Sequence, residues 1–420
     1  MRTCGRRADQ ARSPRKRVLE VRPGLSYSAV AGKSFARRRC RQRAQGKRVK
    51  SRRSARNIPC HQAFASMVLG TMHSNSHGPD FASFAAADEA RRGWGRVLDF
   101  WMARRETPYR LVLERPGLRL RCYGRPGDQP SWLIIPAPIK KHYIWDLLPP
   151  VSVVQRCLES GFNVYLLEWT EAPRDDPNIG IATYADRHIL DCANAIGRPI
   201  VLAGHSLGGT FAAIFSSLHP EKVGALVLLE APLSFAEDTG AIARLIRQFP
   251  SVEALSGFDD CPGVLLGALG VAASPESFLW WRWRDGVASL VDPEALYTHL
   301  LVERWLLDEL AMPGGLFADV VDLYRQDHFM RGTLRVGDKP AAARNVTAPV
   351  LAVIDPESDV VPPSSVMPFL DVLPGRDKKL LRYEGDTGIA LRHVGVLVGR
   401  NAHRTLWPEV LAWVNSRSAH

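Results

Sequence analysis

The sequence predicts an α/β fold in which a mostly parallel sheet is flanked by helices and carries an inserted helical cap. Short apolar runs alternate with stretches of helical periodicity over residues 110–231, the pattern of successive strand–helix–strand units. The alternation stops over 232–344, where helical runs rich in Trp and Leu follow one another. It resumes over 345–415 with two strand-like runs and a closing amphipathic helix. A single sheet interrupted by one insertion accounts for all three observations.

The expected elements are given in chain order. Residues 73–109 should form a linker and a first helix over Ala87–Arg105, and Arg110–Tyr123 should form a hairpin around Pro116-Gly117. Strands are expected over Trp132–Ile135, Asn163–Trp169, Ile200–Ala203, Ala225–Leu229, Pro349–Ile354 and Lys379–Tyr383. Helices are expected over Val151–Glu159, Thr183–Ile196, Leu207–His219 and Ala402–Trp413. No strand is expected in the cap.

A motif at the end of one expected strand carries the main indication of function. The apolar run Ile200–Ala203 leads into Gly-x-Ser-x-Gly at residues 204–208, and a helical pattern comes next. A strand, a tight turn and a helix in this order form a nucleophile elbow. Gly204 and Gly208 are the small residues that a strained serine backbone needs on either side. We therefore expect Ser206 to be a nucleophile, and an ordinary glycine-rich turn is the alternative interpretation.

A serine nucleophile needs a base, usually histidine, and a carboxylate that orients the base. In elbow enzymes both come after the serine, at the ends of the last strands. His393 lies between the last expected strand and the closing helix, whereas His403 falls on that helix and should fill the surface or the core. Three carboxylates compete for the acid: Asp355, Glu357 and Asp359. Asp359 is preferred because it precedes Val-Val-Pro, while Asp355 at the strand end should cap a turn.

Two backbone N–H groups should stabilise the oxyanion of the reaction. The first belongs to Leu207, at the start of the helix that follows the serine. The second should come from the loop at 136–140, Pro-Ala-Pro-Ile-Lys. Its two prolines have no N–H. Ala137, Ile139 and Lys140 remain, and Ile139 is preferred.

Several blocks resemble polyhydroxyalkanoate synthases. Residues 136–147, Pro-Ala-Pro-Ile-Lys-Lys-His-Tyr-Ile-Trp-Asp-Leu, resemble that family's Pro-Pro-x-Ile-Asn-Lys-x-Tyr-Ile-x-Asp-Leu block. Residues 323–332 resemble its Leu-Tyr-x-x-Asn-x-Leu-x-x-Gly segment, and residues 393–395 resemble its terminal His-Ile-Gly block. The strand end at 167–169 and the closing helix are similar as well. The likeness spans roughly residues 110–414 and includes the cap.

The resemblance implies the α/β-hydrolase fold and an acyl-enzyme that receives hydroxyacyl groups from coenzyme A thioesters and elongates a polyester. The family nucleophile is cysteine, however, and this chain has Ser206. Family asparagines are also replaced, by Lys140 and Asp327. A serine ester is a less activated acyl donor than a thioester, so we expect hydrolysis or transfer of a (hydroxy)acyl ester or thioester. The alternatives are a true synthase and a non-catalytic protein that binds polymer granules.

The expected partners depend on this interpretation. The substrate should be a small acyl ester or acyl-CoA, with polyester as a further partner if polymer forms. We expect no cofactor and no metal, and leave a homodimer open. A cytoplasmic location is expected because the seven cysteines are scattered, with no Cys-x-x-Cys pair. No run of 18 apolar residues occurs, so no transmembrane helix is expected.

The net charge of +12 belongs to the N-terminal tail. Residues 1–60 hold 20 Lys and Arg, with Asp9 and Glu20 as their only acids, and this leaves 35 basic and 41 acidic residues for the rest. With almost no apolar periodicity, residues 1–72 should be disordered. A transit peptide is one interpretation. Sequence upstream of a misplaced start, with Met67 or Met72 as the first residue, is preferred, and nucleic-acid binding is not inferred.

Overall fold

The computed structural model of this protein describes residues 81–102, 105–125, 129–173, 179–236, 239–248, 260–386 and 388–418. These ranges comprise most of the predicted core and cap. The predicted basic tail over 1–72 and the first part of the predicted linker lie outside the described residues.

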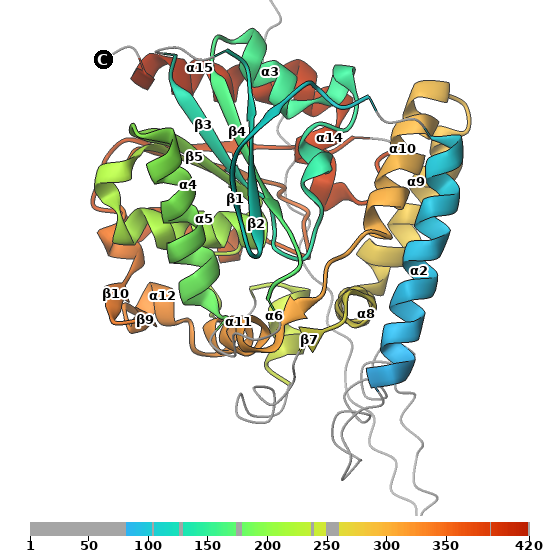
Figure 1. Ribbon diagram of the computed structural model, residues 1–420, viewed down its shortest axis with the longest axis horizontal. Coiled ribbons are helices and arrows are strands. Elements are labelled where there is room, and N and C mark those ends of the chain that lie inside the picture. Colours follow the sequence, from blue (N-terminus) through green and yellow to red (C-terminus); the bar gives the residue numbers. More distant parts are fainter. Residues whose placement is uncertain are drawn as a thin grey trace, which may run out of the picture. The chain divides into compact units, whose positions relative to one another are not determined.

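A single eight-stranded sheet forms the centre of the fold (Figure 1). Its order is β1-β2-β4-β3-β5-β6-β11-β12. Strand β2 is antiparallel to both of its neighbours, β1 and β4, and the six strands from β4 to β12 are mutually parallel. The strands are β1 (Arg110–Arg115), β2 (Leu118–Tyr123), β3 (Ser131–Ile135), β4 (Asn163–Trp169), β5 (Ile200–His205), β6 (Val223–Leu229), β11 (Val350–Ile354) and β12 (Lys378–Arg382). The predicted hairpin and all six predicted parallel strands are present, with ends that differ by one or two residues.

Helices cover both faces of the sheet, because successive strand residues point to opposite sides. In β3, Leu133 and Ile135 belong to one buried cluster, and Trp132 and Ile134 belong to the other. The first cluster includes residues of α4 (His188–Ile196), α5 (Leu207–Leu218), α6 (Ala241–Ile246), α8 (Gly263–Ala273), α11 (Gly314–Gln326) and α13 (Met367–Val372). The second includes residues of α3 (Val153–Glu159), α10 (Pro293–Leu306), α14 (Gly395–Val398) and α15 (Trp407–Ser418). The predicted α/β-hydrolase architecture is confirmed.

The segment between β6 and β11 is mainly helical. Besides α6, α8, α10 and α11 it holds α12 (His328–Arg331) and a continuous helical stretch formed by the π-helical turn η5 (Glu276–Trp280) and α9 (Trp281–Ser289). The expectation of no strand here was wrong. Asp260–Cys261 (β7) pairs with Met312–Pro313 (β8), and Leu334–Val336 (β9) forms a hairpin with Lys339–Ala341 (β10). Strands of two or three residues are too short to show alternation.

The first described helix, α2 (Phe81–Trp101), begins earlier and ends earlier than predicted. It packs against α8 and α10, as Figure 1 also shows. Arg304 of α10 donates to both carboxylate oxygens of Asp99 on α2, at 2.9 and 2.7 Å. Arg91 of α2 donates to the carbonyl oxygen of Glu309. This helix therefore holds α10 and the segment that follows it.

Backbone contact at the strand–helix turn fixes the position of Ser206. A Cβ on Gly204 would lie 2.6 Å from the Gly208 carbonyl oxygen, and a Cβ on Gly208 would lie 2.3 Å from the Ile135 carbonyl oxygen. A Cβ on Gly209 would lie 2.4 Å from the Ala231 Cβ. All three distances are shorter than any van der Waals contact. Glycine at these positions is what allows β5, α5 and the end of β3 to approach this closely.

Replacing Gly208 with alanine should destabilise the fold by about 1–3 kcal/mol, because the new methyl group meets backbone atoms that cannot rotate away. Chemical denaturation of Gly208→Ala and wild type would measure the difference. Gly224→Ala is the matched control, since its nearest atoms would lie 3.7 and 3.9 Å away. That control should change stability by less than about 0.5 kcal/mol, and equal effects of the two variants would contradict the packing argument.

Candidate active site

Ser206 sits in a strained turn between β5 and α5. Its backbone has φ 55° and ψ −134°, a left-handed conformation that costs a non-glycine residue of order 1–3 kcal/mol. Hydrogen bonds on both sides hold it there: the Ser206 amide donates to Leu229 O at 3.1 Å, and its carbonyl accepts from Gly209 N at 2.9 Å. The hydroxyl is thereby presented at the carboxyl edge of the sheet, beside the start of α5.

His393 is brought to the same edge by the short helix η8 (Arg392–Val394). Its side chain is buried, and it lines the same pocket as Ser206. The His205 ring donates from Nε2 to the His393 carbonyl at 2.9 Å, and the two rings are tilted by 38° with their centroids 4.5 Å apart. Within the described residues the His393 Nε2 atom has no hydrogen-bond partner. An unpartnered ring nitrogen is what a general base needs to accept a proton.

The carboxylate that contacts His393 is Glu230. Its Oε2 lies 2.7 Å from His393 Nδ1, and its side chain is fully buried. Glu230 directly follows β6, with a left-handed φ of 43°. Its amide donates to Val353 O of the neighbouring strand at 2.9 Å. Held in this way, the carboxylate can orient the imidazole so that Nδ1 carries the proton and Nε2 stays free.

Burial favours the neutral form of each group in this pair. It raises the pKa of Glu230 well above its ordinary value, and the nearby Asp355 carboxylate raises it further. Burial also lowers the pKa of His393. A buried glutamate and histidine at hydrogen-bond distance titrate as one coupled pair, so an apparent pKa belongs to the pair and not to either residue. Uptake of a proton by the pair would deprive Nε2 of its role as a base.

Asp359, the preferred acid of the sequence analysis, lies elsewhere. Its side chain is about half exposed and accepts a hydrogen bond from Arg244 at 3.1 Å. It does not line the pocket that holds Ser206 and His393. Asp355 is fully buried, accepts from the Glu357 amide as a turn cap, and is paired with Arg392. The structure therefore does not bring Asp359 to His393, because its chain has already turned toward solvent.

Sequence reasoning missed Glu230, although a signal was present. The residue stands alone as an acid in Leu228-Leu229-Glu230-Ala231-Pro232, where its neighbours are apolar. A carboxylate at the end of a buried strand needs a partner to offset the cost of burial. That partner comes from residue 393, far away in the chain, so only the folded arrangement could identify it.

The predicted oxyanion donors lie at the same place. Leu207 opens α5 and lines the pocket together with Ala137 and Ile139. The Lys140 amide donates to Ala137 O at 3.0 Å, so it is occupied in a turn. Among the described residues, the amides of Ala137 and Ile139 donate no hydrogen bond. Either of these two amides is therefore free to act with Leu207.

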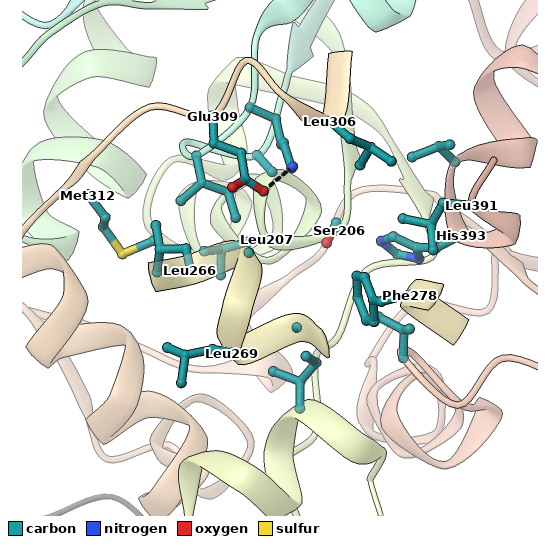
Figure 2. Close-up of a pocket in the computed structure, with 18 of the residues that line it drawn as sticks. Ser206, Leu207, Leu266, Leu269, Phe278, Leu306, Glu309, Met312, Leu391 and His393 are labelled. Carbon is teal, nitrogen blue, oxygen red and sulfur yellow. Dashed lines mark hydrogen bonds and ion pairs between the residues drawn. The ribbon is translucent and has the colours of Figure 1, made fainter. Parts of the chain in front are cut away.

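Ser206 and His393 line one pocket of about 520 Å³, and Figure 2 shows both among its lining residues. Its walls are mainly aliphatic and aromatic. They include residues of α6, α8, η5, β8 and α11, namely Leu245, Leu266, Leu269, Phe278, Met312 and Phe317. Pockets of this size with few polar groups bind small apolar ligands.

The charged groups at the pocket wall are largely paired with each other. Lys140 forms an ion pair with Glu309, drawn as the dashed line in Figure 2. Arg91 lies 3.9 Å from the other Glu309 oxygen, and Arg282 is paired with Glu303 at 2.5 Å. Burial lowers the pKa of Lys140. These pairs leave the apolar walls as the main surface for a ligand.

The same ranges offer little for other kinds of site. The described residues hold no group of three or more His, Cys, Asp or Glu side chains that could bind a metal ion. Their cysteines, Cys122, Cys157, Cys192 and Cys261, are free and buried. No single described helix is long and apolar enough to cross a membrane. The bent pair Gly263–Ala273 and Glu276–Ser289 passes that test by length and composition when taken together.

Comparison with known proteins agrees with this geometry. The family model for the α/β hydrolase fold matches residues 133–251. The enol-lactonase from Burkholderia xenovorans superposes with a TM-score of 0.47 and 13% identity, over 73% of this chain and all of that one. The sheet order, the turn at Ser206 and the family match agree in giving this chain the α/β-hydrolase fold.

The chain also resembles poly(3-hydroxyalkanoate) polymerases. It is 30% identical over 325 residues to the poly(3-hydroxyalkanoate) polymerase subunit PhaC of Haloferax mediterranei, covering 74% of this chain and 65% of that protein. It is 24% identical to the subunit of the same name from Allochromatium vinosum, covering 74% of this chain and 89% of that one. The chain thus spans about two thirds of the first relative's length. The resemblance predicted from the motifs is confirmed.

The contact between Glu230 and His393 leads to a prediction about the reactivity of Ser206. Glu230→Gln should slow labelling of Ser206 by a fluorophosphonate probe by about a thousandfold or more, because the imidazole loses the carboxylate that fixes its proton on Nδ1. Asp359→Asn is the matched control and should stay within about threefold of wild type, since it breaks only an exposed ion pair. The reverse order of effects would restore Asp359 as the acid.

Proposed function

We propose that this protein is an acyl-transfer enzyme that uses Ser206 as its nucleophile, His393 as its base and Glu230 as the orienting acid. The observation that carries the proposal is the buried 2.7 Å contact between Glu230 and His393, with the free Nε2 of His393 beside Ser206 in one pocket. The resemblance to polymerases named for hydroxyalkanoates supports an acyl substrate. The strained backbone of Ser206 supports the nucleophile assignment.

The proposed chemistry has two halves. Ser206 Oγ attacks the acyl carbonyl while His393 Nε2 takes its proton, and the oxyanion accepts hydrogen bonds from Leu207 N–H and a loop amide. Collapse of this tetrahedral oxyanion intermediate breaks the bond to the leaving alcohol or thiol, and the leaving group receives the proton from His393. Water or a hydroxyl acceptor then attacks the acyl-serine with the same proton transfers. The products are a free serine and a carboxylic acid or a new ester.

The substrate we propose is a (hydroxy)acyl ester or thioester with an apolar chain. The walls of the pocket are formed by Leu, Ile, Val, Phe and Met side chains. Each methylene group removed from water contributes about 0.8 kcal/mol. A chain of several carbons would gain much more from this pocket than an acetyl group.

Polymer synthesis is the second candidate, favoured by the resemblance to polymerases over most of the chain. The two candidates differ only in the acceptor that releases the acyl-serine. A serine ester is less activated than a thioester, and hydrolysis or single transfer is therefore the first choice. Product analysis separates them.

Replacing Ser206 with alanine should lower kcat by a factor on the order of a million, because loss of the nucleophile leaves only binding and oxyanion stabilisation. The assay would measure coenzyme A released from 3-hydroxyacyl-CoA, with circular dichroism as the control for folding. Release of a monomeric acid would identify a hydrolase, and precipitated polymer a synthase. Equal activity of wild type and Ser206→Ala would rule out Ser206 as the nucleophile, and no activity in either would leave a binding protein.

Narrowing the pocket should change chain-length preference. Leu266→Trp should reduce kcat/KM for an octanoyl ester relative to a butyryl ester by about tenfold, because the indole fills space that the longer chain needs. Leu300→Trp is the control, since Leu300 is 40% exposed on α10 and does not line the pocket. An unchanged ratio in Leu266→Trp would mean that the acyl chain lies elsewhere.

A further inference from the structure

A buried ion pair lies beside the Glu230–His393 pair. Arg392, the residue before His393, donates to both oxygens of Asp355, the second of these bonds measuring 3.0 Å. Asp355 is fully buried, and the Arg392 side chain is two-thirds buried. The guanidinium also donates to Glu357 at 2.7 Å and to Glu384 O at 3.3 Å. Two carboxylates therefore neighbour the base, and one of them is neutralised by a cation.

The sheet register explains why the two carboxylates are close. Leu229 of β6 pairs with Val353 of β11. Glu230 directly follows β6, and Asp355 directly follows β11. Parallel strand ends lie at one edge of the sheet, about 5 Å apart. Two carboxylates at such a spacing raise each other's affinity for protons unless a cation intervenes.

We propose that the Asp355–Arg392 ion pair is a positioning and charge-balancing element, which holds the His393 loop against β11 and keeps Glu230 in its carboxylate form. The inference rests on the proposed function of Ser206, His393 and Glu230. Arg392 has two connected effects. Its backbone carries His393, and its guanidinium offsets the Asp355 charge that faces Glu230. Neither residue lines the pocket, so both act through the pair and not on the substrate.

The charged and titratable groups around Glu230 come from four elements. His393 and Arg392 belong to η8, and Asp355 and Glu357 follow β11. Tyr383 follows β12 with its hydroxyl bonded to Asp386 at 2.9 Å, and burial raises its pKa well above the ordinary value, so it is neutral. His205, at the end of β5, is also kept neutral because burial lowers its pKa. Glu357 is mostly exposed, so the charges to alter next to the base pair are those of the buried Asp355 and its partner Arg392.

The two halves of the ion pair should therefore have opposite effects on pH dependence. Activity requires the Glu230–His393 pair without its extra proton, so activity is lost as the pH falls through the apparent pKa of the pair. Asp355→Asn removes a negative charge and should lower that apparent pKa. Arg392→Gln removes a positive charge and should raise it. We expect shifts of about half a pH unit or more in each direction.

The experiment measures kcat/KM against pH for wild type, Asp355→Asn, Arg392→Gln and the double variant, with circular dichroism to verify folding. In the double variant, the apparent pKa of the acid limb should return most of the way to the wild-type value. Asp99→Asn, which breaks the remote pair with Arg304, should leave that limb unchanged. If Arg392→Gln does not fold, Asp355→Asn alone still decides, because only its downward shift agrees with the proposal.

Two other results would overturn the inference. Shifts in the same direction, or lower activity with an unmoved acid limb, would mean that the ion pair is purely structural. These outcomes are distinct from failure of the proposed function, since they require activity that Ser206→Ala abolishes. If wild type has no such activity, the function itself fails first.

Discussion

Backbone-to-backbone contact at the elbow is the constraint on which the site depends. Gly208 lies against the Ile135 carbonyl, and Gly209 lies against Ala231, so α5 starts in contact with the ends of β3 and β6. Ser206 is forced into its left-handed conformation at the junction. Because protein interiors are close-packed, a shift of any of these segments would displace the hydroxyl. The position of Ser206 is therefore set by packing between α5 and the ends of these strands.

The second constraint is electrostatic. Glu230, Asp355 and His393 are buried at one sheet edge, and a buried charge needs a partner. Among the described residues, Arg392 is the one cation that hydrogen-bonds directly to the side chains of these three residues. Its guanidinium donates to both carboxylate oxygens of Asp355. The carboxylate of Glu230 is hydrogen-bonded to His393 instead. The division of partners between the two acids gives them different roles, although both follow neighbouring parallel strands.

The part of the pocket formed by the segment between β6 and β11 is mainly apolar. Lys140 and Glu309 are paired with each other at the edge. Charge on the loop after β3 is thus neutralised where the loop meets the segment after α10. Ser206 and His393 line this mainly apolar pocket, which agrees with the proposed acyl substrate. Low polarity around a reacting carbonyl also strengthens hydrogen bonds to a developing oxyanion.

Local sequence was sufficient for the features that depend on neighbours in the chain. Strand runs, the glycine spacing around Ser206 and the position of His393 after the last strand could be predicted, because each is a pattern within a few residues. The carboxylate that contacts His393 could not be predicted in the same way. Asp359 matched a local pattern, yet its chain turns toward solvent and Arg244. Glu230 reaches His393 because β6, β11 and β12 follow one another in the sheet, and the segment after β12 brings residue 393 back to the end of β6, 2.7 Å from the Glu230 carboxylate. Partners separated by 163 residues are chosen by strand order and burial, and these exist only in the tertiary structure.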